Sequence, residues 1–559
     1  MSLVSTTIPN LVNGVSQQPY SLRLASQCEA QVNAHSSVVE GLRKRPPTRF
    51  KARIRNAPVA EGSVFTHIIN RDQTERYIVV IQNGYLQVFD TYGNEKSVYA
   101  QNGWGYLSCA EPGTSFSVVT VADYTFIVNK TVTVQKSGDV LPTRVPEALC
   151  WIKQGNYSTY YKLFVNNVLV GEYFTPDGSV AEHKDKIRTE YIVQQLVQQF
   201  AANLDFNVWS VGSTIHFTRK NGGDFICRSE DSFGDQAMAV IKDSVQRFSD
   251  LPKRGVPGFK VQVRGDQTSS FDDYWVEYKD DGSYNGVWQE TYKGGELYRL
   301  ELTTMPHVLI RNSDGTFTFK AQAWEGRQVG DTDSAPFPSF VDHKISDVFF
   351  HRNRLGFISD ENVVFSRAGD FFNFFRETIT AVLDSDPIDV AVSHTKISLL
   401  RHAIPFNETL LLFSDQTQFQ LSQGDILTPK TIAINQTTEF ESSLLAKPVG
   451  AGKNVYFCVN KGKFTGIREY YVDGDTKTND AADITSHVPK YIPGNVTKLA
   501  ASSNEDMLVA LSRNERGALY VYKYYWSGNE KLQSSWSKWQ FPTGVSVLNV
   551  DFIESDLYL

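Results

Sequence analysis

The sequence predicts a mainly β protein in which a β-propeller-like array of hairpins is interrupted by an inserted α+β domain. Aromatic residues make up 13% of the 559 residues, and such rings favour the half-buried faces of strands. Pairs of apolar runs separated by turn residues recur towards both ends of the chain. A single stretch, residues 186–200, has a clear helical period.

The first hairpins are expected within residues 61–149, after an N-terminal arm and basic segment at residues 1–60. Residues 76–90, RYIVVIQNGYLQVFD, contain two apolar runs that meet at Asn83 and Gly84. An Asn-Gly pair between alternating runs is a strong hairpin signal because both residues tolerate a left-handed backbone. Residues 116–135 repeat this plan, so the sequence predicts two early hairpins.

The rhythm of hairpins stops between residues 150 and 335, where we expect an inserted α+β domain similar to a platform. Its helix is KIRTEYIVQQLVQQF, residues 186–200. At 3.6 residues per turn its apolar side chains gather on one face and its glutamines lie mostly off that face. The residues of the predicted apolar face are Ile187, Tyr191, Leu196 and Phe200.

The hairpins return in residues 336–559, which we assign to the remaining propeller blades. Four stretches each hold a pair of strand-like runs, and their starts recur about every 50 residues, a spacing typical of propeller blades. A pair of β-sandwiches is the alternative architecture. The four stretches are residues 347–366, 409–422, 454–472 and 506–526.

Motifs for cofactors and metals are missing from the sequence, so we predict no cofactor and no resident metal. The five cysteines are far apart and form no C-x-x-C pair. GAGKN at residues 450–454 has Lys447 where a phosphate loop needs glycine and Asn454 where it needs Ser or Thr, so we expect a β-turn there.

Asp384, Asp386 and Asp389 are close in sequence, but the glycine and final glutamate of a calcium loop are missing. We therefore interpret them as turn-forming residues. Glu439 and Glu441 alternate, so on a strand both would face the same side, as in a glycosidase pair or on an ordinary exposed face.

The chain is acidic overall, with a formal charge of −7, yet residues 43–55 contain seven basic residues and no acid. Pro46 and Pro47 exclude a helix, and beyond them cations and apolar residues alternate, so a strand would separate them on two faces. Three interpretations are open: a solvated edge strand protected by cations, a docking face for another protein, and a grip on DNA, which the acidic chain least favours. The seven residues of this basic segment are Arg43, Lys44, Arg45, Arg49, Lys51, Arg53 and Arg55.

Several long stretches, in order along the chain, resemble tail tubular protein B, the nozzle of short-tailed bacteriophages. The resemblance begins with NLVNGVSQQPYSLRLASQCEAQVNAHSSVVEGLRKRPP at residues 10–47 and includes HRNRLGFISDENVVFSRAGDFFNFF at residues 351–375. Further stretches that carry it are DSDPIDVAVSH (384–394), LLLFSDQTQFQLS (410–422), QTTEFES (436–442) and DITSHVPKYIPG (483–494).

The resemblance implies a structural protein of the virion tail that is assembled in the bacterial cytoplasm and is not an enzyme. Family members look like propeller-containing subunits of a hexameric ring beneath the adaptor ring of tail tubular protein A. They help hold tail fibres, close the channel before infection, and let double-stranded DNA and internal core proteins leave. They are usually longer, so we expect that a C-terminal part of the family is missing here.

By the same analogy, the basic segment is a candidate contact between ring subunits or with the adaptor. The alternative function is a virion-borne glycan hydrolase or a glycan-binding propeller. Trp526, Trp536 and Trp539 would then stack on sugars, although strand packing is the simpler expectation for them.

Overall fold

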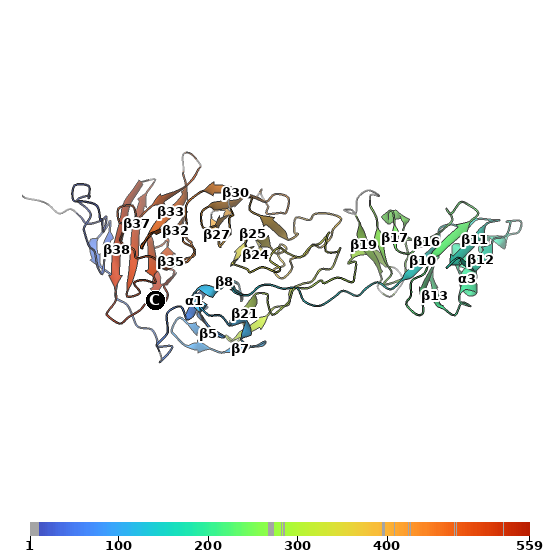
Figure 1. Ribbon diagram of the computed structural model, residues 1–559, viewed down its shortest axis with the longest axis horizontal. Helices are drawn as coiled ribbons and strands as arrows, with labels where there is room; N and C mark the ends of the chain where they lie inside the picture. The colour runs from blue at the N-terminus through green and yellow to red at the C-terminus, as the bar shows by residue number, and fades with distance from the viewer. Residues whose placement is uncertain are drawn as a thin grey trace, which may run out of the picture.

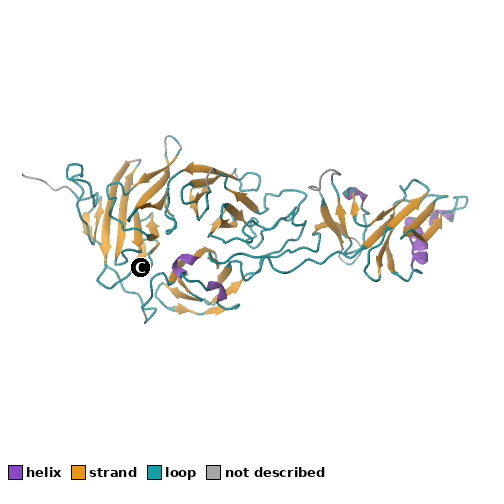
Figure 2. Ribbon diagram, viewed as in Figure 1, coloured by secondary structure: helices purple, strands orange, loops and turns teal. Residues whose placement is uncertain are grey.

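The computed structural model describes residues 10–559 except 57, 266–272, 281, 283–285, 394–396, 407, 423, 425, 474–475, 477 and 529. The molecule is elongated, with six sheets of four or five strands gathered at one end and an inserted region at the other (Figure 1). Five of these sheets are antiparallel, and one also contains a parallel pair of strands. Strands dominate both ends, and the helices are few and short (Figure 2). The predicted mainly β class is confirmed.

Five of the six gathered sheets each consist of four strands that follow one another along the chain. The first sheet contains β3 (Val64–Asn70), β4 (Arg76–Gln82), β5 (Tyr85–Asp90) and β6 (Glu95–Lys96). The third contains β23 (Asp347–His351), β24 (Arg354–Ser359), β25 (Asn362–Phe365) and β26 (Ile388–Ala391). The fourth contains β27 (His402–Phe406), β28 (Thr409–Phe413), β29 (Gln418–Ser422) and β30 (Ala433–Thr438). The fifth contains β31 (Val449–Ala451), β32 (Asn454–Lys461), β33 (Phe464–Val472) and β34 (Asn479–Asp483). The sixth contains β35 (Val496–Ser502), β36 (Met507–Ser512), β37 (Ala518–Ser527) and β38 (Glu530–Gln540).

The second sheet is assembled from two distant parts of the chain. It contains β7 (Val98–Ala100), β8 (Phe116–Val121) and β9 (Tyr124–Asn129), with the short helix α1 (Pro112–Ser115) before β8. Its other strands, β21 (His307–Arg311) and β22 (Phe317–Ala321), come after the insertion, and β21 pairs with β9. We expected both strands to belong to the inserted domain at residues 150–335. They instead complete the second sheet, so the insertion lies between β9 and β21.

One edge strand of each sheet packs against an edge strand of the next sheet. The contacts run from β3 to β8, from β8 to β23, from β23 to β27, from β27 to β31 and from β31 to β35. The hairpin of β39 (Asp551–Ile553) and β40 (Asp556–Tyr558) packs on β35, and its Glu554 forms an ion pair with Arg76 of the first sheet. Glu61, just before β3, also accepts from Arg513 at 2.7 Å. The last sheet therefore returns to the first, an arrangement like that of propeller blades around an axis.

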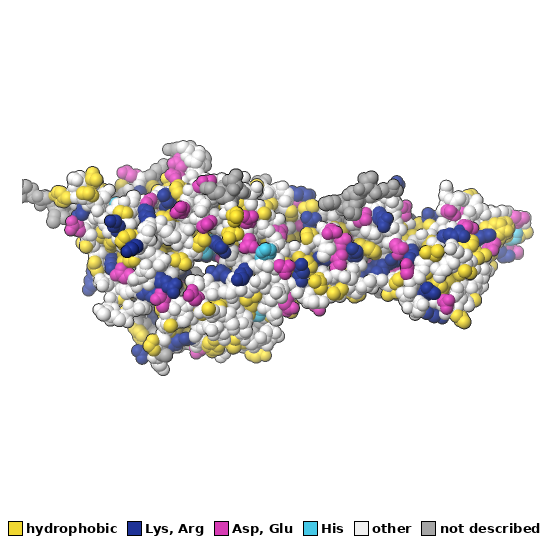
Figure 3. All heavy atoms as spheres, in the orientation of Figure 1, with side chains coloured by type: hydrophobic (Ala, Val, Ile, Leu, Met, Phe, Trp, Pro, Cys, Tyr) yellow, Lys and Arg dark blue, Asp and Glu magenta, His cyan; other side chains and the backbone are white. Residues whose placement is uncertain are grey.

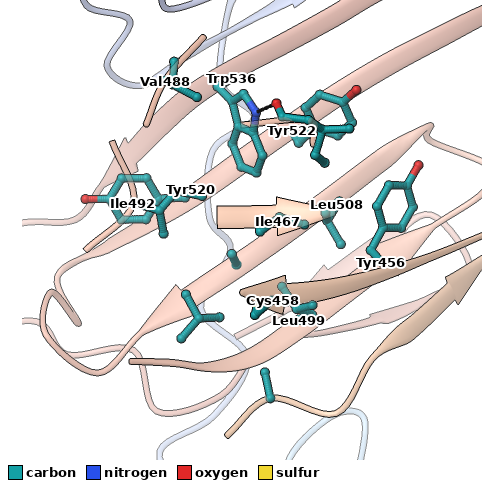
Figure 4. Close-up of a cluster of buried hydrophobic side chains, with 14 of the residues drawn as sticks. Tyr456, Cys458, Ile467, Val488, Ile492, Leu499, Leu508, Tyr520, Tyr522 and Trp536 are labelled. Carbon is teal, nitrogen blue, oxygen red and sulfur yellow. Dashed lines mark hydrogen bonds between the residues drawn. The ribbon is translucent and has the colours of Figure 1, made fainter. Parts of the chain in front are cut away.

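Apolar cores fill the spaces between neighbouring sheets. Between the fifth and sixth sheets, the rings of Tyr522 and Trp536 lie 5.0 Å apart, and Trp536 Nε1 donates to the Ile484 carbonyl at 2.8 Å (Figure 4). Fully burying a side chain of this size contributes roughly 2–3 kcal/mol. Cores of this kind fix each sheet to its neighbours.

The N-terminal arm covers the outer edge of the sixth sheet. Val15 donates to the Trp536 carbonyl at 3.0 Å, and Asn33 donates to the Lys538 carbonyl at 2.8 Å, so both bond to β38. The arm also forms the hairpin β1 (Ala34–Ser37) and β2 (Gly41–Lys44), and β1 packs on β38. An edge that would otherwise expose unpaired backbone groups is thus occupied.

The inserted region holds three sheets and the main helix. One sheet contains β13 (Phe206–Val211), β14 (Thr214–Arg219), β10 (Glu147–Ile152) and β16 (Met238–Ile241). Another contains β12 (Val168–Phe174), β11 (Tyr160–Val165) and β15 (Cys227–Asp231). The third contains β17 (Ser244–Val245), β18 (Lys260–Val263), β19 (Tyr274–Lys279) and β20 (Val287–Thr291).

Helix α3 (Thr189–Phe200) follows the short α2 (His183–Lys186) and packs its apolar face on the first two of these sheets. The predicted helix at 186–200 is present. Leu196 and Phe200 are buried as expected, whereas Ile192 and Val193 replace Ile187 and Tyr191 as its other buried residues.

Three hydrogen bonds to the Glu290 carboxylate, which we call the Glu290 clamp, join the insertion to the third sheet. Glu290 of β20 accepts from the Thr378 hydroxyl at 2.5 Å, the Ile379 amide at 3.0 Å and the Thr380 hydroxyl at 2.5 Å. These three partners belong to the loop between β25 and β26. The insertion is therefore held by side-chain contacts as well as by its two connecting segments.

Candidate assembly surface and central polar cluster

The basic segment runs along the outside of the molecule from the sixth sheet to the first. Arg43 and Lys44 end β2, but residues 45–56 belong to no strand. The predicted strand at residues 49–55, and with it the edge-strand interpretation, is wrong, because these residues span the distance between two sheets and pair with neither.

Contacts near both of its ends hold the basic segment in place. The Arg45 guanidinium lies 5.2 Å from the centre of the Phe541 ring, just after β38. Arg55 donates to Gln87 Oε1 of β5 at 2.8 Å, and Lys51 Nζ lies 5.6 Å from the centre of the Tyr92 ring. The segment thus bridges the sixth and first sheets from outside.

Between these anchors the segment exposes apolar and basic side chains together. Phe50 is 79% exposed and Ile54 is 45% exposed. Arg49 and Arg53 are exposed and form no ion pair with any described residue. Elsewhere, basic and acidic side chains are interspersed over the face shown in Figure 3. An exposed phenylalanine close in sequence to two basic residues that form no described ion pair is typical of a surface that contacts another protein.

A second polar group, which the sequence did not reveal, lies where these edge strands meet. We call this group the hub cluster. Five of the six gathered sheets contribute a strand residue to it, and the fifth sheet contributes a residue from the segment just before β31. Its members are His67 of β3, Thr120 of β8, Asp347 of β23, His402 of β27, Lys447 just before β31, and Lys498 of β35.

Asp347 is the centre of the hub cluster. It is 1% exposed, and both of its oxygens lie 2.8 Å from Lys447 Nζ. The Ser117 hydroxyl donates to it at 2.5 Å and the Ala403 amide at 2.9 Å. Burial alone would raise the pKa of Asp347, but Lys447 and these donors outweigh burial and lower it, so the carboxylate is charged.

The two histidines of the hub cluster are neutral at physiological pH. Burial, reinforced by Lys498 and Lys447, lowers the pKa of His67 to about 3. Burial also lowers the pKa of His402 to about 4, although Asp347 opposes the shift. His67 Nε2 lies 2.8 Å from the Thr120 hydroxyl, and His402 Nε2 lies 3.3 Å from the Leu444 carbonyl.

The three aspartates at residues 384–389 form hydrogen bonds that hold neighbouring segments of the fold together. The backbone carbonyls of Asp384 and Asp386 accept from the buried Arg354 guanidinium at 2.6 and 2.7 Å. Asp389 accepts from the Ser339 hydroxyl and amide, each at 2.7 Å. In the described part of the chain, no group of three or more His, Cys, Asp or Glu side chains is placed to hold a metal ion.

The glycosidase arrangement does not form. Strand β30 ends at Thr438, so Glu439 and Glu441 follow it in a loop and do not alternate on a strand as expected. Trp536 and Trp539 are 0% and 6% exposed and pack in cores, which is the strand-packing expectation. The turn expected in GAGKN forms at Gly452 and Lys453, between β31 and β32.

No helix among the described residues is long and apolar enough to span a membrane.

Comparison with known proteins identifies strong and weak relatives. The family model for the bacteriophage nozzle protein matches residues 1–559. Tail tubular protein gp12 of Escherichia phage T7 is 39% identical over 566 residues, which cover 100% of this chain and 71% of the relative.

Likeness to solved structures is slight. A 6-phosphogluconolactonase-type protein from Bacteroides uniformis gives a TM-score of 0.29 at 12% identity, over 86% of this chain and 97% of that chain. The WD40 domain of Toxoplasma gondii coronin gives 0.26 at 11% identity, over 60% and 70%. TM-scores this low do not establish a shared fold.

Proposed function

The chain belongs to the bacteriophage nozzle protein family, as a structural protein of the virion tail, and we propose that its copies join through the basic segment into a ring. Six copies are what the family resemblance implies. The proposal concerns how the tail protein assembles and what passes through the assembly.

The main support for this proposal is the exposed side chain of Phe50, which lies between Arg49 and Arg53 in the sequence. A phenylalanine that is 79% exposed gains free energy by leaving water, and burying it in a partner contributes about 2 kcal/mol. The basic residues need acidic partners, and the remainder of this acidic chain supplies an excess of them. A second copy of the chain, or an adaptor subunit, therefore fits the basic segment better than DNA does.

We propose that the ring lies beneath an adaptor ring of tail tubular protein A and helps to hold the tail fibres. In this position it closes the channel before infection and conducts double-stranded DNA and internal core proteins during ejection. A channel that gripped phosphates with many cations would retain DNA through counterion release. We therefore infer that the channel wall is poor in Lys and Arg.

We propose that the protein works without catalytic turnover. Glu439 and Glu441 do not share a strand face, and the two buried tryptophans of the candidate stacking set are not available to a sugar. A hydrolase activity would be revealed by release of reducing ends from host surface polysaccharide. We expect none from the purified chain or from intact tails.

Electron microscopy of purified tails tests the location and the ring directly. With a label fused to the turn at Gly178 in the inserted domain, we expect one labelled position per subunit in a single ring below the adaptor. Labels along the fibres, or a single label per tail, would contradict the proposal.

A further inference from the structure

A hollow of about 430 Å³ opens on the outside of the gathered sheets, between the first sheet and the second. Residues of β5, β6 and β7 line it. Strands β6 and β7 lie at the opposite edges of their sheets from β3 and β8, which pack on each other. Figure 1 shows β5 and β7 at this outer edge. The hollow therefore faces outward, and its volume is that of a site for a small molecule.

Two aromatic rings form one wall of the hollow. Tyr85 is 42% exposed, and its ring centre lies 5.1 Å from that of Trp104, with the ring planes at 63°. Trp104 in turn stacks on the buried Phe319 of β22, with ring centres 5.5 Å apart. The exposed ring of Tyr85 is thus supported from the core. A ring that is held in one orientation gives a ligand a flat apolar surface at little cost in conformational entropy.

The charged groups of the hollow balance each other. Glu95 Oε1 accepts from Gln87 Nε2 at 2.8 Å, which orients the carboxylate. Lys96 Nζ lies 3.3 Å from Asp90 Oδ2, so this ammonium already has an acidic partner. A phosphate would find no unpaired cation here, and a ligand cation would meet Lys96 next to Glu95. A neutral ligand with several hydroxyl groups fits this wall better than either kind of ion.

We propose that the hollow binds a neutral saccharide ring, stacked on Tyr85 and hydrogen-bonded to Glu95, Ser97 and Trp104. A carboxylate accepts from sugar hydroxyls, a serine hydroxyl both donates and accepts, and an indole N–H donates. Of the described lining residues only Glu95 carries a carboxylate, whereas glycosidases use a pair of acids. The site therefore holds a sugar without cleaving it, and it does not depend on ring formation.

Saturation-transfer NMR on the full chain with glucose, galactose and N-acetylglucosamine tests the site. We expect a saturable signal from at least one of these neutral sugars. Tyr85→Ala should abolish this signal because it removes the stacking surface, whereas Tyr85→Phe keeps the ring and should retain it. Glu95→Gln can still accept from Gln87 but loses a charge-assisted hydrogen bond to the sugar, so binding should weaken about fivefold to tenfold.

Tyr20→Ala is the matched control, because Tyr20 is an exposed aromatic residue of the N-terminal arm and should not affect the signal. Mass photometry of Tyr85→Ala should show the same assembly as the wild type, so a failure of sugar binding is distinguishable from a failure of ring formation. The proposal is overturned by the absence of a saturable signal with all three sugars, or by equal signals in wild type and Tyr85→Ala. Stronger binding of cationic glucosamine or of glucose 6-phosphate would also overturn it, because the site would then select a charge.

Discussion

Asp347 and Lys447 form a bidentate ion pair, in which both carboxylate oxygens lie 2.8 Å from Lys447 Nζ. The pair joins β23 of the third sheet to the segment that leads into β31 of the fifth. The same carboxylate accepts from Ser117 of the second sheet and from the Ala403 amide of the fourth. A single buried side chain therefore connects four consecutive sheets. This connection explains how sheets that share no backbone ladder keep a common centre.

Replacing Asp347 by Asn should destabilise the protein by about 2 kcal/mol, because the amide NH2 would face donors that now bond to a buried carboxylate oxygen and would leave them without an acceptor. Urea unfolding of the two proteins at neutral pH measures the difference. Asp551→Asn is the matched control: it breaks the Lys498 pair, whose side chains are about one third exposed, and should cost less than about 1 kcal/mol. Equal losses in the two variants would show that Asp347 is not the connecting residue.

The hub histidines should make stability depend on pH. Their folded pKa values, about 3 for His67 and about 4 for His402, lie below the unfolded value near 6.5. The unfolded chain therefore takes up protons that the native chain excludes, so stability is fully present above pH 6.5 and falls as the pH drops towards 4. Each histidine contributes at most about 1.4 kcal/mol per pH unit.

Urea unfolding at a series of pH values between these limits measures the slope. His67→Gln should flatten it, since a glutamine can keep the bond to Thr120 and does not titrate. A slope in His67→Gln as steep as that of the wild type would contradict the assignment.

Arg354 is 1% exposed, and its guanidinium donates to backbone carbonyls of Ser366, Asp384 and Asp386 at 2.6–2.8 Å. Arg354→Lys keeps the charge but loses the planar fork, so we expect about 2–3 kcal/mol of destabilisation. Arg352→Lys changes the exposed neighbour and should leave the unfolding midpoint within error. A midpoint shift of the same size in both variants would show that the carbonyl contacts do not matter.

Loss of the Glu290 clamp should free the insertion without unfolding the six sheets. In Glu290→Ala, which removes the acceptor, we expect the Ile379 amide, which now donates to the carboxylate at 3.0 Å, to exchange with deuterium at least about tenfold faster. Amides of the third-sheet strands should be unaffected. Glu230→Ala, an exposed change on β15, is the control and should alter neither set.

Much of the fold could be predicted because its signals are local. The Asn83-Gly84 turn forms, with Gly84 at φ +68°, and the four late hairpins appear where the apolar pairs predicted them. The composite second sheet could not be predicted. Nothing in the sequence of β21 shows that its partner is β9, more than 170 residues earlier along the chain.

The basic segment was recognised from its charge, but its conformation was not. Alternation of cations and apolar residues at Arg49–Arg55 matches a strand period, yet a strand also needs a neighbour, and the segment has none in either sheet. The hub cluster was missed altogether. Asp347, His402 and Lys447 each stand alone at the start of a strand or just before one, where a polar residue ordinarily faces solvent. Only the packing of one edge strand from each of the six sheets brings them together.

The mass of the purified chain in solution, with and without changes to the basic segment, tests the central claim most directly. We expect the wild type to form a discrete ring by mass photometry. Phe50→Ser combined with Arg53→Glu should give monomers of unchanged Tm, while the exposed control Lys220→Glu should still assemble. A wild type that stays monomeric, or a double variant that forms rings as well as the wild type, would contradict the account.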